Sequence, residues 1–268
     1  MTRVFSVPFA FSILGLVISG VFIGVMWLEN YPVDSPLPVG IVVGRTLQTM
    51  VSSSFVLVLC VVSTILECCF QTFTFIWSPI LIHSEPSAYQ EISFGAIWAS
   101  LSASYLCGLS VFSSHYLRKV SNSRILCGSI LVATFSWMYS FYELSAKEEK
   151  AWSAFNALIG FHFFNFSIGL FMPAADALQA TLIPGVQRSN VSSLTRIFVN
   201  IMCLVLILGV FPKSNGYHDV IFIILCLLII SCILVIILDV ALSKKYNRDL
   251  NDFNHIIFNE SISGVSEA

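Results

Sequence analysis

Seven runs of apolar residues divide the chain, separated by short stretches that contain charged residues, glycine or proline. The runs cover residues 5–28, 51–80, 94–116, 125–142, 152–182, 193–212 and 219–240. A bilayer core of about 30 Å needs about 20 residues of helix at about 1.5 Å per residue. The pattern therefore predicts an all-α membrane protein with seven transmembrane helices.

The second run carries its polar residues on one side. At about 100° per residue they fall within an arc of about 100°; they are Ser52, Ser53, Cys60, Ser63, Glu67, Gln71, Thr74 and Ser78. Glu67 lies in the middle of the run, where a carboxylate costs about 2.5–3.5 kcal/mol on insertion scales. We expect this face to look into the bundle or a wet cavity, with Glu67 either protonated or paired with a cation.

The fifth and sixth runs supply further polar residues. His162, Asn165, Gly169, Pro173 and Asp176 share an arc of about 80° on the fifth run, which Pro173 is expected to kink or to end. The sixth run begins with Arg196 and Asn200 on one face. We therefore predict that the substrate or a coupling ion is bound by residues from a set of six: Glu67, Gln71, His162, Asn165, Arg196 and Asn200. Purely structural roles stay open for three of them. Glu67 could form a hydrogen bond between helices, His162 could be a buried hydrogen-bonding histidine, and Arg196 could anchor its helix at the membrane surface.

The polar stretches predict the division of the chain. Residues 29–50 carry three prolines and two glycines, which predicts a broken linker, and residues 243–268 are polar enough to predict a disordered tail. We expect a leading transmembrane helix at 1–28, a cytosolic linker at 29–50, a six-helix unit at 51–242 and a cytosolic tail at 243–268. The run from Val4 to Leu28 is too long for a signal peptide, so it is interpreted as a spanning anchor.

Basic residues predict the orientation in the membrane. Most of them fall in loops that seven crossings would place on one side, namely Arg45, Arg118, Lys119, Arg124, Arg188, Lys244, Lys245 and Arg248. Because loops rich in lysine and arginine stay in the cytosol, we expect the N-terminus outside and the C-terminus inside, in a multi-pass protein of the plasma membrane.

Composition excludes several classes of function. Hydrophobic residues make up 57% of the chain and charged residues 10%, against about 25% charged in soluble domains. The net charge of −2 and the lack of a dense basic cluster argue against nucleic acid as a partner. The eight cysteines lie inside apolar runs, and no zinc spacing, nucleophile motif or phosphate loop is present. We expect neither an enzyme nor a bound cofactor or metal.

Small residues predict where helices approach closely. The first run contains Gly20 and Gly24, and the third carries two ridges with a small residue at every fourth position. The ridges are Gly95, Ala99 and Ala103, and Ser100, Ser104 and Gly108. Both ridges are expected to seat neighbouring helices.

Four motifs in register resemble the molybdate-anion transporters of the major facilitator superfamily. They are Trp27-Leu28-Glu29-Asn30-Tyr31, Glu67 with the segment from Phe75 to Leu81, the segment from Gly169 to Pro173, and Ile183-Pro184 followed by Arg196. Such transporters have twelve spans in two six-helix halves. The resemblance implies that this chain holds the last span of the N-terminal half, the central loop and the C-terminal half. The first five family spans are absent, and Asn165 stands where the family has an acidic residue.

The resemblance implies secondary uptake of molybdate by alternating access, in a chain that is truncated and inactive unless it pairs with a second six-helix half. Molybdate is a tetrahedral oxyanion and needs hydrogen-bond donors, which Gln71, His162, Asn165, Arg196 and Asn200 can supply. The alternative is a seven-span receptor-like or regulatory membrane protein without transport activity. Its receptor form is disfavoured because the third and seventh runs lack the Asp/Glu-Arg-Tyr and Asn-Pro-x-x-Tyr motifs.

Overall fold

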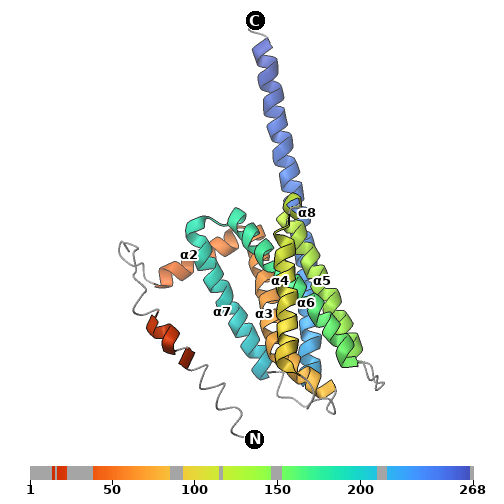
Figure 1. The fold of residues 1–268 in the computed structure, drawn as a ribbon. Coiled ribbons are helices and arrows are strands. Elements are labelled where there is room, and N and C mark those ends of the chain that lie inside the picture. Colours follow the sequence, from red (N-terminus) through yellow and green to blue (C-terminus); the bar gives the residue numbers. More distant parts are fainter. Residues whose placement is uncertain are drawn as a thin grey trace. The chain divides into compact units, whose positions relative to one another are not determined.

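The computed structural model describes residues 14–15, 17–22, 39–84, 93–114, 117–145, 153–209 and 216–265, and within them it contains helices and no strand. The elements are α2 (Val39–Ser52), α3 (Ser54–Ser84), α4 (Phe94–Phe112), the short 3-10 helix η1 (Leu117–Lys119), α5 (Asn122–Ser145), α6 (Ser153–Leu182), α7 (Gly185–Gly209) and α8 (Gly216–Val265) (Figure 1). The predicted all-α fold class is confirmed.

Six helices of the described part are long and apolar enough to span a membrane. Their spans are Ser54–Ile82, Phe94–Phe112, Asn122–Leu144, Phe155–Leu182, Gln187–Gly209 and Asp219–Lys244, which correspond to six of the seven predicted runs. The first predicted span, 5–28, lies largely outside the described residues, of which 14–15 and 17–22 are helical. The chain divides into two compact units, Met1–Val39 and Gly40–Ala268, and the bundle belongs to the second.

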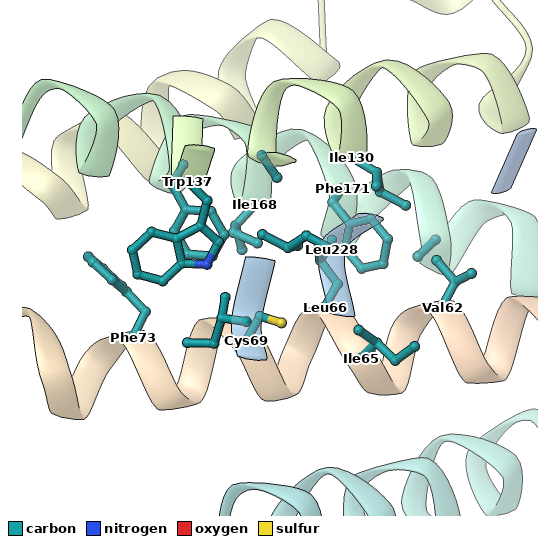
Figure 2. Close-up of a cluster of buried hydrophobic side chains, with 14 of the residues drawn as sticks. Val62, Ile65, Leu66, Cys69, Phe73, Ile130, Trp137, Ile168, Phe171 and Leu228 are labelled. Carbon is teal, nitrogen blue, oxygen red and sulfur yellow. The ribbon is translucent and has the colours of Figure 1, made fainter. Parts of the chain in front are cut away.

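Helix α3 packs against three other helices of this bundle, α6, α7 and α8. Its apolar side forms the largest core cluster, in which α5, α6 and α8 also take part. Figure 2 shows Leu66, Cys69 and Phe73 of α3 facing Trp137 of α5 and Leu228 of α8. The ring centroids of Phe73 and Trp137 are 5.9 Å apart in an edge-to-face arrangement. The side of α3 opposite the predicted polar arc thus builds the core.

Helices α4 and α6 cross at two glycines. A Cβ atom added to Gly108 would lie 2.1 Å from the carbonyl oxygen of Phe166, and one added to Gly169 would lie 2.1 Å from the carbonyl oxygen of Tyr105. The backbones can approach this closely because neither residue has a side chain. The predicted seat at Gly108 is therefore confirmed.

The second small-residue ridge of α4 behaves differently. Gly95, Ala99 and Ala103 are exposed, and a Cβ atom added to Gly95 would meet nothing within 4 Å. In the part of the chain that the structure describes, this ridge seats no neighbouring helix. Sequence spacing marks a surface that allows close approach, but it does not identify which such surface is used.

Part of the predicted linker is helical. Residues 29–38 lie outside the described part, but α2 covers Val39 to Ser52, including Gly40 and Gly44. The prediction of a broken linker is wrong for this stretch, in which Met50 belongs to a small core cluster with Val191 of α7. Gly40 and Gly44 are exposed, and each costs this helix about 1 kcal/mol relative to alanine.

Prolines do not end the helices that contain them. Pro79 lies inside α3 and Pro173 inside α6. Close to Pro79, Trp77 is 7% exposed and stacks on Trp98, with ring centroids 5.7 Å apart. Membrane helices continue through proline when neighbouring groups satisfy the freed carbonyl.

Helix α8 also continues past a predicted boundary. It contains 50 residues and is therefore about 75 Å long, more than twice the length that a bilayer core needs. No helix end coincides with residue 242, where the disordered tail was expected to begin. The division of the chain into a transporter unit and a cytosolic tail stays a prediction.

Candidate functional site

Three charged residues from three helices lie within electrostatic reach of one another. Glu67 of α3 is half-buried, while Arg196 of α7 attracts its carboxylate and Asp176 of α6 repels it. No ion pair of 4.0 Å or less joins them among the described residues. The two carboxylates and the guanidinium therefore influence one another electrostatically without a direct ion pair.

Gln71 extends this region by one turn of α3. Its Oε1 atom accepts a hydrogen bond from the Cys203 thiol at 3.6 Å, and the Cys203 and Cys68 sulfur atoms are 3.5 Å apart. Thr72 donates a hydrogen bond to the Cys203 sulfur at 3.7 Å. A polar and thiol cluster thus lines the contact between α3 and α7. The sequence placed these cysteines in apolar runs but gave no sign that they meet.

One side of α7 presents a polar stripe. Arg188, Ser192, Arg196 and Asn200 recur at every fourth residue, and all except the half-buried Ser192 are exposed. Ile197 and Ile201 lie elsewhere on the helix and are each 54% exposed. The exposed surface of α7 therefore has a polar part next to Glu67 and an apolar part suited to lipid.

His162 and Asn165 are engaged in structural hydrogen bonds instead. His162 Nδ1 lies 2.8 Å from the Leu158 carbonyl oxygen and Nε2 lies 3.0 Å from Ser100 Oγ, so the ring bridges α6 and α4. The Asn165 amide donates to the Phe161 carbonyl at 2.8 Å. Both residues are at least about 16 Å along α6 from Asp176, at about 1.5 Å per residue. The six predicted residues thus divide into Glu67, Gln71, Arg196 and Asn200 on α3 and α7, and a separate pair on α6.

Two hollows lie on the described part of the bundle, and one of them borders the charged cluster. A polar pocket of about 450 Å³ lies where α6 ends and α7 begins, and it is lined by Asp176, Gln179, Gly185, Arg188, Ser189 and Ser192. The other, of about 370 Å³, is an apolar groove between α5 and α6, lined by Val132, Phe135, Ser136, Tyr139, Ile159 and Phe163. The polar pocket is continuous in sequence with the stripe on α7 and shares Asp176 with the charged cluster.

A part-buried polar contact between α5 and α8 lies outside the residues predicted from the sequence. Ser123 donates a hydrogen bond to Asp239 Oδ1 at 2.6 Å, which joins the first turn of α5 to α8. A carboxylate at this position also stabilises the positive end of the α5 dipole. Asp239 could have been found by the argument used for Glu67, because it is an acidic residue inside a predicted apolar run.

Comparisons with known proteins agree with a membrane transporter. A family model of the major facilitator superfamily, described as sugar transporters with 12 TM, matches residues 3–146. The molybdate-anion transporter of Xenopus laevis is 29% identical over 189 residues, which are 70% of this chain and 40% of that protein. The molybdate-anion transporter of Danio rerio is 25% identical over 175 residues, 63% of this chain and 34% of that protein. The match thus spans less than half the length of these relatives. No solved structure matches the chain.

Proposed function

Because this chain belongs to the major facilitator family described as sugar transporters with 12 TM, we propose that it forms a six-helix half of a secondary transporter. We propose that the transported species is molybdate or a similar oxyanion, as the names of the relatives suggest. The supporting observation is the Arg196 guanidinium within reach of the Glu67 carboxylate, inside two candidate spans. Fixed donors inside a membrane are costly and usually serve a substrate or ion.

The chemistry of the cluster suits an oxyanion that moves together with a proton. Arg196 supplies a bidentate pair of N–H donors, and Asn200, one turn further along α7, supplies an amide. Glu67 can attract the guanidinium when the site is empty. A proton on Glu67 releases Arg196 for the anion and removes the repulsion between the carboxylate and the substrate. Glu67 is accordingly the proposed coupling residue and Arg196 the proposed anion ligand.

A second six-helix half completes the proposed site. Arg196 and Asn200 are exposed on the described bundle, although both lie inside a candidate membrane span. Polar groups in such positions face a partner or a wet cavity rather than lipid. In transporters built from repeats, the substrate binds between the halves near the midplane, and alternating access is the rocking of one half against the other. Transport by this chain is therefore proposed to need a partner half.

The basic residues support the proposed orientation. The contact of Thr49 with Gln187 joins the end of α2 to the start of α7, and that of Ser123 with Asp239 joins the start of α5 to α8. Because consecutive spans cross the membrane in alternating directions, α3, α5 and α7 are expected to start on the same side. Arg45, Arg124 and Arg188 belong to these segments. We propose that this side faces the cytosol and that the membrane is the plasma membrane.

Uptake of labelled molybdate by cells that express the chain tests the proposal. The chain is expressed alone and together with the N-terminal half of a molybdate-anion transporter. We expect uptake in the second case, and a loss of about tenfold or more in Arg196→Gln because a charge-assisted hydrogen bond contributes about 1.5–3 kcal/mol. Arg124→Gln is the matched control, since Arg124 is an exposed arginine at the start of α5. Surface expression is measured for every variant.

Two outcomes would change the proposal. Uptake of a labelled sugar in place of molybdate would favour the function in the family description, for which Glu67 and Gln71 would accept hydrogen bonds from hydroxyl groups. A surface-expressed chain that transports neither compound, alone or with the partner half, would contradict transport. It would leave the regulatory or receptor-like alternative.

A further inference from the structure

The polar pocket at the turn between α6 and α7 lies at the depth of lipid headgroups. The candidate spans end at Leu182 and begin again at Gln187. Asp176 lies six residues before the end of α6, about 9 Å along the helix axis. The pocket of about 450 Å³ therefore starts at the membrane surface and reaches a short distance inward.

The α7 side of this pocket consists of donors for a phosphate group. Arg188, Ser189 and Ser192 line it with a guanidinium and two hydroxyl groups, and Gly185 adds the first residue of the helix. The Pro184 carbonyl accepts hydrogen bonds from the N–H groups of Gln187 and Arg188. Proline has no side-chain acceptor that could cap the first N–H groups of α7. The positive end of the helix dipole thus points toward the same space as Arg188.

The α6 side carries a polar group that lacks a partner. Gln179 lines the pocket and is 7% exposed, so its side chain is more than nine-tenths buried. Its backbone carbonyl accepts a hydrogen bond from Ile183, but its side-chain amide makes no hydrogen bond within the described part of the chain. The amide atoms themselves are not fully buried, so they can donate hydrogen bonds to a ligand in the pocket and accept them from it.

Asp176 determines which kind of phosphate compound fits. It lines the pocket together with Arg188, so the two charged side chains have opposite signs. A free inorganic oxyanion would fill a small part of about 450 Å³ and would be repelled by the carboxylate. A phosphate that carries an ammonium group pairs with both: the phosphate with Arg188 and the α7 donors, and the ammonium with Asp176 and the Gln179 carbonyl oxygen.

We propose that this pocket binds a phosphoethanolamine group, with Arg188 as the ligand of the phosphate and Asp176 as the ligand of the ammonium. At the membrane surface the same group is available as the headgroup of phosphatidylethanolamine, and in solution as free phosphoethanolamine. The pocket shares Asp176 with the charged cluster, but binding to it can be measured without a partner half or a transported anion.

The test measures lipid binding to the purified full chain in detergent by native mass spectrometry and by thermal unfolding. The probes are short-chain phosphatidylethanolamine, short-chain phosphatidylglycerol, free phosphoethanolamine and inorganic phosphate. We expect phosphatidylethanolamine to bind about tenfold more tightly than phosphatidylglycerol, which lacks the ammonium group. Arg188→Gln and Gln179→Leu should each weaken its binding about tenfold, whereas Arg124→Gln, the matched loss of charge on α5, should leave it unchanged.

The decisive variant is Asp176→Asn. It should still bind both lipids but lose the preference for phosphatidylethanolamine, a result that a misfolded chain could not give. Free phosphoethanolamine as strong a ligand as the lipid would support the site and identify a soluble source. Unchanged binding in Arg188→Gln and Gln179→Leu would overturn the proposal. Inorganic phosphate or molybdate that displaces the lipid at equal concentration would also overturn it, because the pocket would then be a site for free anions.

Discussion

At the scale of single residues, the α4–α6 crossing depends on the absence of one side chain. Gly169→Ala would place a methyl group 2.1 Å from the Tyr105 carbonyl oxygen, which belongs to the backbone and cannot turn away. We expect the free energy of unfolding to fall by about 1–3 kcal/mol, the usual cost of overpacking. Thermal unfolding of the purified chain in detergent, followed by circular dichroism, measures the change.

Gly95→Ala is the matched control for this prediction. It makes the same substitution in the same pair of helices, at a position where the new methyl group meets nothing within 4 Å. Alanine stabilises a helix by about 0.5–1 kcal/mol relative to glycine, so no loss of stability is expected. Equal destabilisation by both substitutions would show that the crossing at Gly169 is not under steric constraint.

Asp239 lends itself to a graded test at the same scale. Asp239→Asn keeps an oxygen atom that can accept the hydrogen bond from Ser123 but removes the charge near the start of α5. Loss of the favourable charge–dipole interaction should cost about 0.3–1 kcal/mol, and Asp239→Ala, which also removes the acceptor, about 1–3 kcal/mol. Chemical unfolding of the two variants, with Ser123→Ala as a third, measures the order. An Asp239→Ala variant as stable as the parent would contradict a structural role for this contact.

At the scale of elements, α7 is attached to the bundle mainly through α3. The contact includes the Cys68 and Cys203 sulfur atoms, which are 3.5 Å apart and must approach to about 2.05 Å to form a bond. We expect a mild chemical oxidant to join them, as the two thiols give up two protons and two electrons to it. Peptide mapping by mass spectrometry without reduction identifies the link.

The neighbouring cysteine makes this prediction specific. Cys69 belongs to the core cluster on the other side of α3, as Figure 2 shows, so it should stay reduced under the same conditions. Cys203→Ser should abolish the cross-link, and Cys69→Ser should leave it intact. A dominant link between Cys69 and Cys203 would mean that α3 is rotated relative to α7.

The elements themselves could largely be predicted from the sequence, whereas their contacts could not. Length and hydropathy are local properties, so six apolar runs correspond to six helices that can span a membrane. Whether a polar side chain reaches the candidate site or bonds to a nearby backbone carbonyl depends on the neighbouring helix. The sequence therefore could not show that His162 and Asn165 make structural hydrogen bonds while Gln71 lies at the α3–α7 contact. Helix α2 was missed because its two glycines argue locally against a helix, while its buried Met50 joins a cluster of residues distant in the sequence.

At the scale of the whole molecule, the polar stripe on α7 is covered either by lipid or by a second half that encloses water. Asn200 and Ile201 are neighbours at the same depth, but they point about 100° apart around the helix. Both are exposed on the bundle. If a second half covers the Asn200 side and encloses a wet cavity, water reaches Asn200 and not Ile201.

Charged thiol reagents distinguish these two surfaces in intact membranes. We expect Asn200→Cys to add reactivity to that of the parent chain and Ile201→Cys to add none, because thiols react as thiolates, which do not form in lipid. With a partner half present, molybdate should slow the reaction at Asn200→Cys by occupying the space beside Arg196. Equal reactivity at both positions would mean that α7 faces one continuous environment, and the six helices would then act without a partner half.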